Sequence, residues 1–198
     1  HLSPRDWNVR FILGEVAAAA GRPERAARWY ADAIDRNPAC AECALGLAEV
    51  ESRLGRDPDP WLAHAIRYGR STAAVRVRAG TLYARLGRHD EATREFAAGA
   101  LGQRENKKEF FALLHRIYPD DVVFDKIIPD AILPEYFAFA QFALGPLAIK
   151  KVWERYERMG LGANSRDEYV TYLLRHGLAH QAWNVRFNGE APPLGTLL

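Results

Sequence analysis

The sequence has only two cysteines and one methionine among its 198 residues, and it has no long apolar run without charge. Two cysteines cannot build a disulfide framework, and they leave the redox compartment undecided. A membrane-spanning helix needs about 18 or more consecutive apolar residues, so no membrane span is predicted. Residues 1–20 also lack the basic start and apolar core of a signal peptide. The sequence leaves the compartment open between cytoplasm and periplasm.

Charge excess and enzyme motifs are scarce as well. The formal net charge is +2, which argues against a dedicated nucleic-acid binder. No phosphate-binding loop, dinucleotide fingerprint, nucleophile elbow or zincin helix occurs. The densest carboxylate group, Asp120, Asp121 and Asp125 with Glu135, follows Pro119, where an aspartate pair typically caps a helix. The sequence therefore predicts a protein that is not an enzyme and that needs no cofactor.

Apolar residues make up 48% of the chain, and they recur in an internal repeat. A shift of 66 positions superposes four pairs: Gly14 on Gly80, Gly21 on Gly87, Ala26 on Ala92, and Tyr30 on Phe96. Gly55 lies 34 residues after Gly21 and 32 before Gly87, so the shift divides into two unequal repeats. We expect three repeats, at about 7–40, 41–72 and 73–106.

Each repeat has the pattern of a helical hairpin. In the first one, apolar residues recur at helical spacing up to Ala20, and Gly21 and Pro23 then separate them from a second stripe that ends at Asn37-Pro38. Glycine ends a helix well, and proline fits the first turn of the next one. Such a unit cannot bury its apolar faces alone and stacks on its neighbours.

The first repeat resembles the tetratricopeptide repeat (TPR), on Leu13-Gly14, Gly21, Ala26, Tyr30, Ala33-Ile34 and Pro38. The third repeat is also similar, although Gly99 stands where the family usually has alanine. The second is degenerate, with GRDPDP at its turn. The resemblance covers about half of the chain and is closest to TPR proteins of bacterial type. It implies that the first helix of each hairpin lines a concave surface that receives a partner peptide or helix.

The second half has a different pattern. Residues 107–134 are predicted to form a packing helix and a connector, and residues 135–187 two further hairpins, because Tyr136 and Tyr169 lie 33 apart. KKVWERY in this part resembles the second helix of half-a-TPR repeats. Residues 188–198 are predicted to be an extended tail, and the abrupt start at His1 suggests a piece of a longer protein. The predicted fold is all-α, a right-handed superhelical solenoid of about five antiparallel hairpins.

The partner is expected to be a protein or peptide on the concave face. The predicted contact residues are Asn8, Phe11, Glu15, Glu42, Leu45, Glu49, Val77, Arg78, Thr81 and Arg85. TPR proteins that hold a terminal carboxylate have basic or amide residues where this chain has Phe11, Glu15, Gly46 and Ala74. Only Arg78 agrees with that pattern, which argues against a carboxylate clamp.

A second hypothesis comes from a basic stretch without acidic residues between Trp61 and His89. It contains Arg67, Arg70, Arg76, Arg78, Arg85 and Arg88. Guanidinium groups suit carboxylates and phosphates, so the stretch predicts an anionic glycan or another polyanion as ligand. The alternative is a solvated face neutralised by neighbouring acidic residues. Self-association through an uncapped end of the solenoid, and a role in bacterial envelope or polysaccharide assembly, are further hypotheses.

Cys40 and Cys43 form a CxxC motif at the start of the second repeat. A redox centre of this kind calls for a preceding strand, and a zinc site calls for two more ligands. Neither is supplied nearby, so no metal site is predicted. We expect both cysteines to be small, half-buried residues that pack between repeats, and the sequence leaves a redox role open.

Overall fold

The computed structural model describes residues 6–103 and 105–187, and within them every regular element is a helix. The all-α prediction is confirmed for this part of the chain. The chain divides into two compact units, which we call the N-unit (His1–Glu105) and the C-unit (Asn106–Leu198), and each is described by itself. The tail predicted for residues 188–198 lies outside the described residues.

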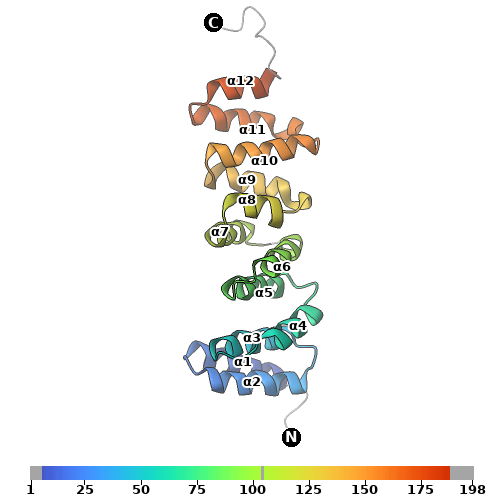
Figure 1. Ribbon diagram of the computed structural model, residues 1–198. Helices are drawn as coiled ribbons and strands as arrows, with labels where there is room; N and C mark the ends of the chain where they lie inside the picture. Colours follow the sequence, from blue (N-terminus) through green and yellow to red (C-terminus); the bar gives the residue numbers. More distant parts are fainter. Residues whose placement is uncertain (1–5, 104, 188–198) are drawn as a thin grey trace, which may run out of the picture. The chain divides into compact units, whose positions relative to one another are not determined.

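The N-unit consists of three successive antiparallel helical hairpins (Figure 1). In each hairpin the second helix packs against the first, and each following hairpin packs on the one before it. The helices are α1 (Trp7–Ala19), α2 (Pro23–Arg36), α3 (Ala41–Arg53), α4 (Asp59–Tyr68), α5 (Ala73–Arg85) and α6 (His89–Gly102).

The turns inside these hairpins share one geometry. Gly21, Gly55 and Gly87 have φ angles of 69°, 70° and 75°, in the left-handed region that favours glycine. The next N–H in each case reaches back to a carbonyl of the preceding helix, as Arg22 does to Ala17 at 2.9 Å. This pattern satisfies carbonyls at the end of the helix and reverses the chain, so the glycine spacing in the sequence fixes where each hairpin turns.

The fully buried ring of Tyr30 holds the first two hairpins together. A Cβ atom at Gly14 in α1 would lie 2.6 Å from this ring, and so would one at Gly46 in α3. Phe96 has the same relation to Gly80 in the third hairpin, where a Cβ would lie 3.0 Å from the ring. Glycine at these positions is therefore required by close packing around an aromatic side chain.

The two cysteines form a disulfide, which was not predicted from the sequence. Cys40 and Cys43 are joined across a Cα–Cα distance of 5.3 Å. Cys40 is the N-cap of α3, and its extended backbone turns its Sγ toward the first helical turn, where the Cys43 N–H lies 3.2 Å away. Both residues are buried rather than half-buried. An i, i+3 pair across a helix start lies within the range that a disulfide spans.

The described part of the C-unit begins with a helix and an irregular connector and continues with four helices of 9 to 14 residues. Its core is aromatic, with Phe137 packed against Trp153, Tyr156 and Tyr169 at ring-centroid distances of 4.9 to 6.0 Å. Phe142, in contrast, is 86% exposed. The elements are α7 (Lys107–Ile117), α8 (Asp120–Val122), the π-helix η2 (Val123–Ile127), the 3-10 helix η3 (Asp130–Ile132), α9 (Leu133–Ala143), α10 (Pro146–Arg158), α11 (Gly162–Arg175) and α12 (Ala179–Phe187).

Candidate partner-binding face

The first helices of the three hairpins are neighbours in the N-unit, because α3 contacts both α1 and α5. We call the surface that these three helices share the first-helix face. All ten predicted contact residues come from α1, α3 and α5, as the repeat register requires. They differ in how available they are to a partner.

Tyr30 reaches this face from α2 and organises its α1 side. Its hydroxyl donates a 2.6 Å hydrogen bond to Glu15 Oε1, and its ring centroid lies 6.1 Å from that of Phe11. Burial raises the pKa of Tyr30 above its usual range, and the hydrogen bond and charge of Glu15 raise it further. The phenol therefore stays neutral and serves as a fixed donor to Glu15.

An ion pair between α3 and α5 lies on the other side of the first-helix face. Arg78 Nη2 lies 2.9 Å from Glu49 Oε2, and its Nε donates to Glu49 Oε1 at 3.2 Å, so the contact is bidentate. Burial lowers the pKa of Arg78, but the hydrogen bonds and charge of Glu49 outweigh burial and leave the pKa raised. Arg78 is thus a charged group whose orientation is fixed by Glu49.

The remaining predicted contact residues are either exposed to solvent or engaged in contacts within the fold. Asn8, Glu42 and Arg85 are exposed. Leu45 is fully buried, so its prediction as a contact residue was wrong: the side chain belongs to the core. Val77 lies against Gly99 of α6, and Thr81 donates to the Val77 carbonyl at 2.8 Å.

The sequence pattern did not identify Tyr30 as part of this face. Its position marked it as the core aromatic of the repeat, and the ring is indeed buried. Its hydroxyl nevertheless emerges beside Glu15, a contact that depends on the crossing of α1 and α2. A buried tyrosine generally finds a partner for its hydroxyl, and this rule is the signal that could have pointed to Glu15.

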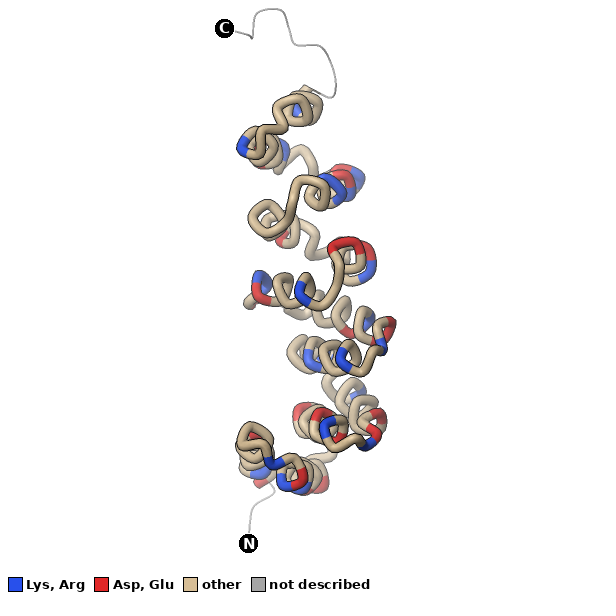
Figure 2. Tube along the Cα trace, turned by 60° about the vertical axis from the view of Figure 1, so that its left-hand side comes forward, with Lys and Arg blue, Asp and Glu red and all other residues tan. Residues whose placement is uncertain are grey.

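Three of the six arginines in the predicted basic stretch are neutralised within the N-unit. Arg76 pairs with Glu95 at 2.5 Å, Arg78 with Glu49, and Arg88 with both Asp59 and Glu91. In Figure 2 only α5 among the helices of this unit carries basic positions without acidic ones, and its neighbours supply the carboxylates. Arg67 lies over the ring of Tyr68. The counter-charges that the sequence suggested are present, which weakens the case for a polyanion site.

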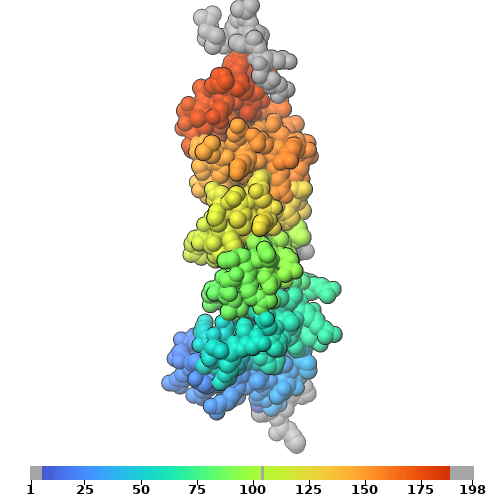
Figure 3. All heavy atoms as spheres, viewed as in Figure 1, coloured from blue at the N-terminus to red at the C-terminus, as the bar shows by residue number. Residues whose placement is uncertain are grey.

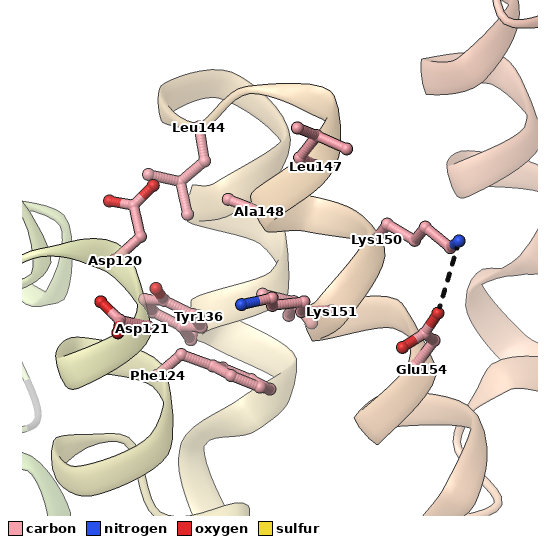
Figure 4. A pocket seen from close by; sticks show the side chains of 11 residues that line it. Asp120, Asp121, Phe124, Tyr136, Leu144, Leu147, Ala148, Lys150, Lys151 and Glu154 are labelled. Atoms are coloured by element: carbon pink, nitrogen blue, oxygen red, sulfur yellow. Dashed lines mark ion pairs between the residues drawn. The ribbon is translucent and has the colours of Figure 1, made fainter.

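The C-unit contains a separate pocket of about 630 Å³. Phe124, Tyr136 and Leu144 supply apolar surface, and Figure 4 shows Asp120 and Asp121 on one side and Lys151 pointing toward them from α10. Lys150 pairs with Glu154 at 3.8 Å. The charges around the pocket are of both signs and nearly balanced, so the pocket is not suited to a polyanion.

Beside this pocket, His115 connects a carboxylate to a phenol. Its Nδ1 lies 2.9 Å from Asp120 Oδ1, and its Nε2 lies 3.0 Å from the Tyr136 hydroxyl. Burial raises the pKa of Tyr136, which keeps the phenol protonated and makes it a poor nucleophile. The arrangement therefore links α7, α8 and α9.

The described residues contain neither a candidate metal site nor a membrane-spanning helix. No three His, Cys, Asp or Glu residues cluster there closely enough to hold a metal ion. None of the described helices is long and apolar enough to cross a membrane.

Comparisons with known proteins add little beyond this geometry. No family model matches the chain, and no curated protein matches it. Among solved structures, the crystal structure of the P58(IPK) TPR domain is similar, at 19% identity and a TM-score of 0.47. The alignment covers 91% of this chain and 49% of that one, so the chain spans about half the length of that structure.

The geometry of the N-unit defines the class of protein. Three antiparallel hairpins stack in order, and each turns at a glycine. In the first and third hairpins an aromatic ring from the second helix, Tyr30 or Phe96, packs on a glycine of the first helix. The chain is an all-α helical repeat protein. Its hairpins are TPR-like in the positions of their turn glycines, and the first and third also in the packing of an aromatic ring on a glycine.

Proposed function

We propose that the protein is a non-catalytic interaction scaffold, and that the first-helix face of the N-unit binds a peptide or helix of a partner protein. One observation carries the proposal. Four helices bring Phe11, Glu15, Tyr30, Glu49 and Arg78 together on one surface, with the polar groups oriented by hydrogen bonds. A pre-oriented surface loses little conformational freedom when a partner binds, which favours binding there.

The chemistry of the face favours a partner of mixed character. The face carries acidic groups from Glu15, Glu42 and Glu49 and basic groups from Arg78 and Arg85. Both kinds of charge therefore lie on the same surface as the apolar ring of Phe11. A partner segment with an apolar side chain between charged ones would complement this arrangement. The envelope or polysaccharide-assembly setting stays a prediction from composition.

The glycan or polyanion hypothesis is the weaker second candidate. It rests on Arg67, Arg70 and Arg85, which have no ion-pair partner among the described residues. Three arginines without a shared pocket give little positive potential, because Arg76, Arg78 and Arg88 are already neutralised.

Affinity capture from a cell extract at low and high salt tests the proposal. The bait is the full chain, alongside a variant with Phe11→Ala and Arg85→Glu. Arg85 has no ion-pair partner among the described residues, and Phe11 is only partly buried, so we expect the variant to fold. Recovery of one defined protein that the variant fails to capture supports the scaffold. Recovery of only anionic glycan that salt removes, or equal recovery by both baits, contradicts it.

A further inference from the structure

The outward side of α1 carries an apolar stripe that no described residue covers. The exposed fractions are 52% for Val9, 52% for Ile12, 37% for Leu13 and 60% for Val16. The four residues follow the i, i+3, i+4, i+7 spacing of one helix face. In Figures 1 and 3 the hairpin α1–α2 lies at one end of the N-unit. Within the N-unit, only the hairpin that begins with α3 follows directly on it. None of its four residues is among the predicted contact residues of the first-helix face.

Three of the four positions are buried in both later repeats, while Ile12 corresponds to the buried Gly46 in α3 and to the partly exposed Arg78 in α5. The internal register, 34 residues to α3 and 66 to α5, relates Val9, Leu13 and Val16 to residues of those helices. None of these counterparts is more than 3% exposed; they are Cys43, Leu47 and Val50 in α3, and Val75, Ala79 and Leu82 in α5. The stripe on α1 therefore occupies a surface that serves as a helix-packing interface elsewhere in the N-unit.

The element that packs on these counterparts is the second helix of the preceding hairpin. Tyr30 of α2 places its ring on Gly46 of α3, the counterpart of Ile12. Gly69, at the end of α4, lies so close to Val75 that a Cβ atom would be 2.6 Å from its side chain. Two interfaces within the chain, α2 on α3 and α4 on α5, thus show how such a surface is covered. In both cases the second helix of a hairpin covers the first helix of the next hairpin.

We propose that the stripe on α1 is a docking site for an amphipathic helix from another helical hairpin, packed as α2 packs on α3. Ile12 stands where α3 has glycine, so the facing residue of the incoming helix must be small rather than aromatic. Beside the stripe, Leu13, Val16 and Trp29 line a hollow of about 130 Å³ with Arg22 and Arg25 at its edge. The incoming helix therefore carries an apolar side chain for the hollow and an acidic one next to it.

A grafted helix tests whether the surface accepts such a partner. Residues 57–72, which contain α4 and its turn, are copied in front of Trp7 in place of residues 1–6. The copied Thr72 is joined directly to Trp7, just as Thr72 precedes Ala73 in the natural chain. The copied His64 is changed to Ala so that its side chain does not clash with Ile12. We expect the copied helix to resist hydrogen exchange and to raise the Tm by several degrees. Ile12→Glu with Val16→Glu should remove both gains in the grafted chain.

The same two substitutions in the ungrafted chain are the control, and they should leave its Tm unchanged because both side chains face solvent. A copied helix that exchanges like an unfolded peptide, with no gain in Tm, overturns the proposal. Sedimentation of the ungrafted chain gives a second readout. A dimer that Val16→Glu dissociates would mean that a second copy of α1 covers the stripe, which also overturns it; a monomer agrees with it.

Discussion

The hydroxyl of Tyr30 donates a 2.6 Å hydrogen bond to Glu15, while the ring of the same residue fills the space left by two glycines. Tyr30 therefore has two structural roles, one for its ring and one for its hydroxyl. Its ring joins the first two hairpins through Gly14 and Gly46, and its hydroxyl orients a carboxylate on the first-helix face. The stability of the N-unit and the geometry of its candidate binding face depend on one side chain.

Gly46→Ala should destabilise the protein. The added methyl would lie 2.6 Å from the fully buried ring of Tyr30, and overpacking of this kind costs about 1–3 kcal/mol. Urea unfolding followed by circular dichroism measures the change. Gly145→Ala is the control for a site with room, because a Cβ there meets nothing within 4 Å. Gly145 is the N-cap of α10, where alanine is a poorer cap, so we expect a cost below about 1 kcal/mol. Equal costs for the two substitutions would refute the packing role of Gly46.

Tyr30 should make the protein less stable at alkaline pH. Its pKa is raised in the folded state above the ordinary value of 10.0, so above that pH the unfolded chain loses a proton that the folded chain keeps. The contribution of Tyr30 to the free energy of unfolding is complete below about pH 10 and is lost as the pH rises further. Tyr30→Phe should flatten the decline of unfolding free energy between about pH 9 and 11, and an unchanged slope would exclude Tyr30 as its source.

The disulfide should be resistant to reduction in the folded protein. Cys40 and Cys43 are 3% and 0% exposed, so no thiol should react with a chromogenic disulfide reagent before reductant and denaturant are added together. The loop that it closes is very short, so its loss should cost only about 2 kcal/mol on the chain-entropy estimate. Cys40→Ser with Cys43→Ser provides the comparison. Two thiols that titrate in unreduced protein would show that the bond does not form.

The pair of Glu49 and Arg78 should contribute modestly to stability. Both side chains are partly exposed, and ion pairs of this kind are worth about 0.2–1 kcal/mol. A double-mutant cycle with Glu49→Gln and Arg78→Gln isolates the coupling energy, which should fall when salt is added. A coupling of zero at low salt would mean that the bidentate geometry does not persist in solution.

The repeat spacing predicted the hairpins of the N-unit because glycine turns leave a mark in the sequence. Gly21, Gly55 and Gly87 fix the turns, and the all-α fold follows. The disulfide was missed because CxxC spacing does not show whether the chain turns the first sulfur toward the second. The burial of Leu45 was missed because the register assigned it to the first-helix face without showing that neighbouring helices close over it.

The affinity of the captured partner for a panel of single variants tests the scaffold most directly. Phe11→Ala, Glu42→Ala and Arg85→Ala change the first-helix face, while Arg94→Ala removes an exposed arginine from α6. Isothermal titration with each purified chain gives the dissociation constants. We predict a loss of about tenfold or more for at least one substitution on the first-helix face, and less than about twofold for Arg94→Ala. Equal affinities across the panel, or a loss confined to Arg94→Ala, would contradict a binding site on this face.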